Sequence, residues 1–105
     1  MSQRLKDKIA IVTGAGSGIG EATARLMARE GATVILADRF APAAEAVARD
    51  ICTRGGTAEA REVDVGDAAA MRRMIEAVAQ RHGRLDVLVN NAGYGNAAIV
   101  VDTDE

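Results

Sequence analysis

Four short runs of mostly apolar residues alternate with three longer segments of helical periodicity, and this alternation constrains the fold more than any other feature of the sequence. The runs predict strands at residues 9–12, 34–37, 57–65 and 85–89, of which the third is the most polar. Strands that alternate with helices form parallel sheets with right-handed crossovers and helices on both faces. The sequence therefore predicts one α/β domain over residues 1–105, with a doubly wound parallel sheet of order 3-2-1-4.

Residues that favour helix ends bound the three predicted helices. Gly31 and Gly83 fit the position just past a helix end, where a left-handed backbone favours glycine. Pro42 fits the first turn of the second helix, and Asp67 fits the N-cap of the third. His82, next to Gly83, is expected to be a capping partner at the end of the third helix.

The core is predicted to be aliphatic, because hydrophobic residues make up 49% of the chain and aromatic residues only 2%. From Ile19, the first helix is expected to bury a stripe of Ala22, Leu26 and Met27. Cys52 falls on the stripe of the second helix and is expected to pack in the core. It is the only cysteine, so no internal disulfide can form, and a reducing cytoplasmic location is the simplest interpretation.

Charge and hydropathy argue against several classes of partner. The formal net charge is −2, with acids and bases interspersed, which gives no electrostatic case for nucleic acid or anionic membranes. The apolar run at residues 9–12 is far too short to span a membrane. The expected partners are a small molecule and further copies of the chain, and no metal site is predicted.

No fifth strand is expected after residues 85–89. The last four residues, 102–105, are typical of an N-cap and an acidic first turn, so the chain would stop where a helix begins. We therefore expect a partial domain whose sheet is truncated after its fourth strand. The open outer edge of that strand would favour pairing with a second chain, so a homo-oligomer is expected.

A glycine-rich loop at residues 13–20 lies between the first strand and the first helix. The amide groups and dipole of a helix N-terminus attract phosphate, and glycines let the backbone approach it. Glu21 follows the last glycine, so the Lys-Ser/Thr of a P-loop is missing, and the spacing G-x-G-x-x-G also fails. The pattern T-G-x-x-x-G-x-G remains and predicts a dinucleotide site. Its candidate residues are Gly14, Ser17, Gly18, Ile19 and Gly20.

Asp38 ends the second strand, where an acid can accept hydrogen bonds from an adenosine ribose. Its carboxylate would repel a 2′-phosphate, so NAD is predicted rather than NADP. Arg39 is adjacent and is kept as a second candidate, because it could hold a phosphate, whereas Ser17 supplies no cation. The alternative is that Asp38 is only a solvated acid at a strand end.

Three motifs in this order resemble those of the short-chain dehydrogenase/reductase family. They are the glycine loop, residues 63–65 (Val-Asp-Val) after the third strand, and residues 90–93 (Asn-Asn-Ala-Gly) after the fourth. The resemblance runs from about Lys8 to the last residue and implies a Rossmann fold that binds a nicotinamide cofactor.

The resemblance also assigns further contacts to the cofactor. It implies that Asp64 and Val65 contact adenine, and that the Asn-Asn-Ala-Gly segment lines a ribose through Asn91, Ala92 and Gly93. Two alternatives stay open. Asp64 could be a surface acid that closes a strand, and the asparagines could only form a turn.

The family's catalytic centre, a Ser, a Y-x-x-x-K pair and an Asn on a later helix, finds no match. Tyr94 is the only tyrosine, and the residue four positions later is Ala98. The only lysines, Lys6 and Lys8, precede the first strand. We therefore assign no catalytic residue and expect the chain alone to lack dehydrogenase activity.

The predicted function is the NAD-binding part of an oxidoreductase that transfers hydride between a nicotinamide and an alcohol or carbonyl substrate. In such an enzyme this chain would bind and orient the cofactor. The alternative is a non-enzymatic, redox-sensing dinucleotide module, because residues 1–105 do not separate the two. A methyltransferase is disfavoured, since its cofactor has no pyrophosphate for the helix end to hold.

Overall fold

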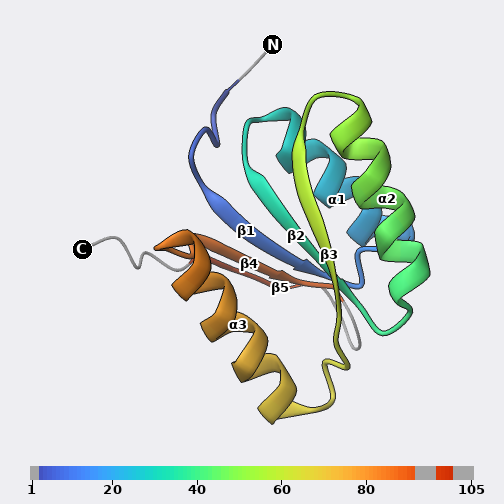
Figure 1. The fold of residues 1–105 in the computed structure, drawn as a ribbon, viewed down its shortest axis with the longest axis vertical. Helices are drawn as coiled ribbons and strands as arrows, with labels where there is room; N and C mark the ends of the chain where they lie inside the picture. The colour runs from blue at the N-terminus through green and yellow to red at the C-terminus, as the bar shows by residue number, and fades with distance from the viewer. Residues whose placement is uncertain (1–2, 92–96, 101–105) are drawn as a thin grey trace.

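Figure 1 shows one sheet with helices on both of its faces. The computed structural model describes residues 3–91 and 97–100. Its helices are α1 (Gly18–Arg29), α2 (Ala41–Thr53) and α3 (Ala68–His82). Its strands are β1 (Ile9–Thr13), β2 (Thr33–Asp38), β3 (Thr57–Glu62), β4 (Val87–Asn90) and β5 (Ala97–Val100).

The strands lie in the order β3-β2-β1-β4-β5, and β1 to β4 pair in parallel. The predicted doubly wound α/β sheet of order 3-2-1-4 is confirmed. In the observed register, Thr13 of β1 lies opposite Ala37 of β2 and opposite Asn90 of β4. The carboxyl ends of these three strands therefore meet at one edge of the sheet (Figure 1).

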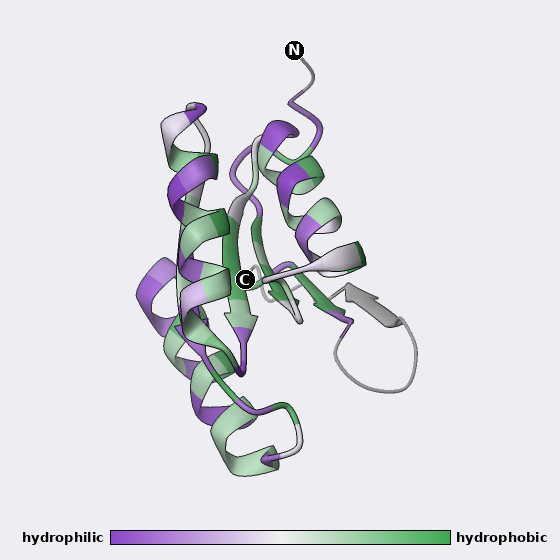
Figure 2. Cartoon of the chain, turned by 90° about the vertical axis from the view of Figure 1, so that its right-hand side faces the viewer, coloured by the Kyte–Doolittle hydropathy of each residue, from purple (hydrophilic) through white to green (hydrophobic). Residues whose placement is uncertain are grey.

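Two apolar clusters form the core, one on each face of the sheet. Val12 and Leu36 pack toward α1 and α2, whereas Ile11 and Ile35 pack toward α3. Adjacent residues of a strand point to opposite faces, so β1 is buried along its whole length. Figure 2 shows hydrophobic colour concentrated on the central strands and mixed with hydrophilic colour on the helices.

The outer edge of β4 is not open, and here the expectation from the sequence was wrong. β5 pairs with β4 in antiparallel orientation, with Val87 opposite Val100 and Asn90 opposite Ala97. The apolar run at residues 97–100 is too short to specify a strand by itself, and the alternating pattern places a further strand only after another helix. The parallel part of the described sheet still ends with β4, as predicted.

The buried face of α1 differs from the predicted stripe. Gly20, Ala24 and Ala28 are buried, whereas Ile19 is 62% exposed and Leu26 is 51% exposed. Ala22 is exposed as well, and of the predicted stripe only Met27 packs, partly buried, against the core. The small residues lie four positions apart and let the helix axis approach the sheet closely. The stripe of larger side chains was an incorrect guide, because it ignored the glycines and alanines on the neighbouring face.

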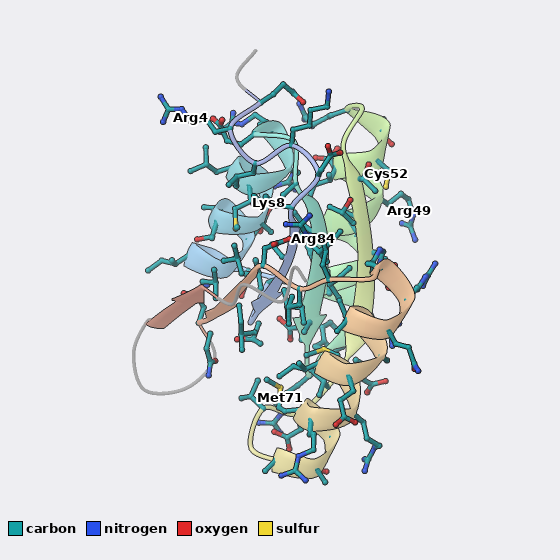
Figure 3. All side chains as sticks on the ribbon, turned by 90° about the vertical axis from the view of Figure 1, so that its left-hand side faces the viewer. Arg4, Lys8, Arg49, Cys52, Met71 and Arg84 are labelled. Carbon is teal, nitrogen blue, oxygen red and sulfur yellow. The ribbon has the colours of Figure 1, made fainter. Side chains whose placement is uncertain are left out.

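Cys52 also departs from its prediction. Its thiol is exposed and free, and Sγ lies 3.4 Å from the carbonyl oxygen of Ala58. Figure 3 shows Cys52 at the outside of the molecule, close to Arg49. The buried face of α2 includes Val47, Ala48 and Ile51, and one further residue turns the side chain about 100° away from that face.

The helix ends follow the sequence signals. Gly31 (φ 101°) and Gly83 (φ 79°) adopt the left-handed backbone just past α1 and α3. The side chain of Asp67 accepts a hydrogen bond from the amide of Ala70 at 3.0 Å. His82 lies in the last turn of α3, but the expected capping bond is not seen: its Nε2 is buried, has no hydrogen-bond partner within the described residues, and lies 3.9 Å from a carboxylate oxygen of Glu59.

Candidate functional site

The candidate residues gather at the carboxyl edge of the sheet, beside the position where β1 separates β2 from β4. The chain leaves β1 for a helix on one face, and it enters β4 from α3 on the other face. In open α/β sheets this reversal of strand order opens a crevice outside the carboxyl ends of the strands, where ligands bind. The loop between β1 and α1 occupies that place.

Each glycine of the predicted motif has its own structural reason. Gly14 (φ 61°) and Gly18 (φ 59°) adopt a left-handed backbone that other residues rarely take. Gly20 faces the loop, and a Cβ at this position would overlap the carbonyl oxygen of Gly14. Two of the glycines therefore form the turn, and the third lets the helix pack against it.

The N-terminus of α1 carries amide groups that no cap covers. Ser17 is the N-cap residue, and its side chain makes no capping hydrogen bond. The first amides of a helix lack intrahelical partners and lie at the positive end of its dipole. Ser17, Gly18 and Ile19 are exposed at this end, so a ligand anion can reach their amides.

Asp38 is held beside this loop by two backbone amides. Its Oδ2 accepts a hydrogen bond from the amide of Gly16 at 2.9 Å, and its Oδ1 accepts one from the amide of Phe40 at 2.9 Å. Arg39 is exposed, and Phe40 is 64% exposed at the N-cap of α2. The sequence analysis did not single out Phe40, although it is the only phenylalanine and directly follows the candidate pair.

Thr13 joins the ends of β1 and β4. It is fully buried, and its hydroxyl donates to Oδ1 of Asn90 at 2.8 Å and accepts from the amide of Asn91 at 3.0 Å. The amide nitrogen Nδ2 of Asn91 is buried and, within the residues that the structure describes, has no hydrogen-bond partner. A buried donor without a partner is costly, so an acceptor for this Nδ2 is expected nearby.

The segment after β3 begins earlier than predicted. β3 ends at Glu62 rather than at residue 65, and the amide of Val63 donates to the carbonyl of Asp38 at 3.1 Å. This bond brings Asp64 and Val65 close to the end of β2. Asp64 is exposed, and its Oδ1 accepts a hydrogen bond from the amide of Gly66 at 2.9 Å.

The last predicted site residues, Ala92 and Gly93, lie outside the described residues, as do Tyr94 and Asn96. Residues 3–91 and 97–100 contain no group of three His, Cys, Asp or Glu side chains that could hold a metal ion. No helix in this described part is long and apolar enough to cross a membrane. With the exposed amides at the N-terminus of α1 and the carboxylate of Asp38 beside them, the carboxyl edge of the sheet is suited to binding an anionic, hydroxyl-bearing molecule.

A separate cavity of about 710 Å³ lies between α1 and α2, away from the candidate edge. Ion pairs join Arg25 and Arg54 to Asp50 on its wall. The hydrogen bonds from Arg25 and then from Arg54 lower the pKa of Asp50 below its usual range. The wall of this cavity therefore carries three arginines, Arg25, Arg29 and Arg54, and one acid, Asp50, which pairs with two of them.

The sequence of this chain is similar to those of known oxidoreductases. The family model for the short chain dehydrogenase matches residues 8–105. Meso-2,3-butanediol dehydrogenase of Serratia marcescens is 44% identical over 100 residues, which cover 95% of this chain and 39% of the relative. The 3-oxoacyl-[acyl-carrier-protein] reductase of Thermotoga maritima is 39% identical over 102 residues, which cover 97% of this chain and 42% of the relative.

Solved structures share the fold of this part of the chain. A metagenomic short-chain oxidoreductase in complex with NADP is 43% identical with a TM-score of 0.83, and the match covers 88% of this chain and 42% of that one. A hydroxysteroid dehydrogenase from Escherichia coli is 39% identical with a TM-score of 0.82, over 88% of this chain and 39% of that one. The chain thus spans about two fifths of the length of these relatives.

Proposed function

This chain belongs to the short chain dehydrogenase family, and from that premise we propose that it binds NAD(H) as the cofactor-binding part of an oxidoreductase. The whole protein would transfer hydride between the nicotinamide and a small alcohol or carbonyl substrate. The names of relatives, a dehydrogenase and a reductase among them, favour this enzyme over a redox-sensing module without activity.

The observation that carries the proposal is the uncapped N-terminus of α1 at the carboxyl edge of the sheet. The pyrophosphate would accept hydrogen bonds from the amides of the loop, where Gly14 and Gly18 shape the turn. A side chain at Gly20 would overlap the loop itself, so the close packing of helix and loop depends on that glycine. These features fit a bound pyrophosphate.

Asp38 supports the choice of NAD over NADP. Its carboxylate is fixed beside the loop, where it can accept hydrogen bonds from the hydroxyls of the adenosine ribose. A 2′-phosphate at the same place would face a negative charge in a partly buried position. One structural relative is in complex with NADP, so membership of the family does not decide between NAD and NADP. The proposed preference for NAD therefore rests on Asp38 of this chain, although the adjacent Arg39 could hold a phosphate.

The remaining contacts belong to the same proposal. Asp64 and Val65 would contact the adenine, next to the end of β2. Asn91 would use its unpaired Nδ2 on the nicotinamide side, together with Ala92 and Gly93. A cytoplasmic location completes the proposal, and the free thiol of Cys52 is compatible with a reducing compartment. The expected self-association is not carried forward, because β5 covers the edge of β4 on which that expectation rested.

A titration followed by the fluorescence of NADH tests this function. The chain is expected to bind NADH, and NAD⁺ and ADP-ribose should displace it because they share the pyrophosphate and the adenosine ribose. S-adenosylmethionine, which has no pyrophosphate, serves as the control and should not compete. Absence of NADH binding at millimolar concentration, with the chain folded by circular dichroism, would contradict the proposal.

A further inference from the structure

Gly16 lies in the middle of the glycine loop, yet its backbone does not require glycine. The glycines with positive φ include Gly14 and Gly18, whereas Gly16 is not among them. The usual conformational reason for a glycine therefore does not apply at this position. The reason must lie in the space around it.

That space is filled by α2 and by Asp38. A Cβ on Gly16 would lie 2.7 Å from Cβ of Ala43, 2.9 Å from Oδ2 of Asp38 and 3.2 Å from the amide nitrogen of Ala44. Carbon and oxygen atoms do not approach this closely without repulsion. Any larger residue would thus displace either the first turn of α2 or the carboxylate of Asp38.

The same residue also binds that carboxylate. The amide of Gly16 donates to Oδ2 of Asp38, while the amide of Phe40 donates to Oδ1, each at 2.9 Å. A carboxylate oxygen has two lone pairs, so each oxygen keeps one acceptor site for a further donor. Asp38 is fixed at both oxygens and can still accept two ribose hydroxyls.

We propose that Gly16 is a positioning residue for cofactor selection, because its amide and its missing side chain together hold Asp38 against the loop. A carboxylate held in this way cannot swing aside to admit a 2′-phosphate, so the chain prefers NAD(H) to NADP(H). This inference rests on the proposed function and deepens it, since it assigns the selectivity to the pair Gly16–Asp38 and not to Asp38 alone.

The test measures the dissociation constants of NADH and NADPH for the unmodified chain and for Gly16→Ala. The added methyl group should displace the carboxylate, so NADH binding weakens about tenfold, the effect of losing one charge-assisted hydrogen bond. NADPH binding should change much less, and the ratio of the two constants shifts accordingly. In Gly16→Ala/Ala43→Gly, the space freed on α2 should restore part of the preference for NADH.

An Asp38→Asn background separates positioning from general damage to the loop. Because the carboxylate is absent there, adding Gly16→Ala should leave the NADH/NADPH ratio unchanged. Equal weakening of both cofactors by Gly16→Ala, or an equal shift of the ratio in both backgrounds, would overturn the inference. An unmodified chain that binds neither cofactor would instead contradict the proposed function.

A second measurement covers the case in which Gly16→Ala does not fold. In Asp38→Ala the amide of Gly16 loses its acceptor, so its hydrogen exchange should become faster, while the amide of Ala70, which Asp67 caps, keeps its rate. An unchanged exchange rate at Gly16 would show that the carboxylate is not held there and would overturn the inference.

Discussion

Asp38 carries the negative charge on which the expected cofactor preference depends. Replacing it with alanine removes the acceptor for the ribose hydroxyls and the charge that opposes a 2′-phosphate. We predict that Asp38→Ala weakens NADH binding about tenfold, from the loss of hydrogen bonds to a charged group. The dissociation constant of NADPH for Asp38→Ala should be equal to or smaller than that for the unmodified chain. Glu45→Gln, at an exposed acid of α2, is the control and should change neither constant. Tighter binding of NADPH than NADH by the unmodified chain would refute the assignment.

Asp86 is a buried acid at the opposite edge of the sheet, 5% exposed. Burial alone would raise the pKa of this carboxyl, but the hydrogen bonds from Arg84 and from the amide of Ile9, with the charges of Arg84 and Lys8, hold it below its usual value. Figure 3 shows Arg84 and Lys8 in the same region of the molecule. The carboxylate therefore ties the start of β4 to the start of β1.

The lowered pKa of Asp86 gives a prediction for stability. A carboxyl with a lowered pKa in the folded state stabilises the fold above its unfolded pKa of about 3.9. This stabilisation is lost as the pH falls through that value toward the folded pKa. At pH 7, Asp86→Ala should lower the free energy of unfolding by about 2 kcal/mol, because Arg84 and Ile9 lose their acceptor.

Urea denaturation at pH 7 and at pH 3 measures this contribution. The difference between Asp86→Ala and the unmodified chain should be smaller at pH 3 than at pH 7. Glu45→Gln, which removes an exposed acid, should show little difference at either pH. If Asp86→Ala lowers the free energy of unfolding by the same amount at both pH values, the charge of Asp86 does not contribute to stability.

Single residues also show what a sequence can and cannot reveal. Asp38 and the glycines lie at the sheet edge where their spacing predicted, since the ends of parallel strands share one edge. The hydrogen bonds from Thr13 to Asn90 and from Gly16 to Asp38 join residues that are far apart in the chain. Such contacts depend on the strand register, which a single sequence does not specify to the residue.

The junction of β1 and α1 offers a comparison of two glycines with different roles. At Gly20 a Cβ would overlap backbone, whereas at Gly18 it would meet nothing within 4 Å but would sit at a φ of 59°. We predict that Gly20→Ala lowers the free energy of unfolding by about 3 kcal/mol and Gly18→Ala by about 1 kcal/mol. Thermal unfolding of both variants checks the order. An equal or smaller cost at Gly20 would contradict the packing described for this junction.

The edge of β4 gives a second test at the level of elements. Deleting residues 97–105 removes β5 and opens the hydrogen-bonding groups of β4, so the shortened chain should self-associate. A chain that ends at residue 100 keeps β5 and is the matched control. Sedimentation should show larger species only for the shorter chain, and the same distribution for both would contradict a protective role of β5.

Element types were easier to predict than their exact faces and ends. Periodicity separates strands from helices, and all three helices and four parallel strands follow that signal. The face of α1 was wrong because Gly20, Ala24 and Ala28 carry little hydropathy but pack closest to the sheet. β5 was missed because a four-residue apolar run does not by itself specify a partner strand.

The molecule as a whole covers about two fifths of the length of its named relatives. Ile19 and Leu26 on α1 are more than half exposed, and β4 is only half buried although it has a strand on each side. The fold class was nevertheless predictable, because each β-α-β unit is specified by its own sequence pattern.

The chain alone is expected to show no dehydrogenase activity. The family's tyrosine–lysine pair has no match in residues 1–105, so proton transfer to or from a substrate oxygen lacks its donor and acceptor. The formation of NADH from NAD⁺ with a panel of alcohols, diols and hydroxysteroids checks this at 340 nm. Turnover by the purified, mass-verified chain would contradict it.

The central claim is that the loop between β1 and α1, with Asp38 beside it, binds the dinucleotide. Amide chemical shifts recorded while NADH is added test it most directly, because they report the position of the ligand residue by residue. The largest changes should fall on the amides of residues 14–20, on Asp38 and on Asn91, and ADP-ribose should reproduce those at the loop and at Asp38. Changes that centre instead on the cavity between α1 and α2, at Arg25, Asp50 and Arg54, would contradict the account.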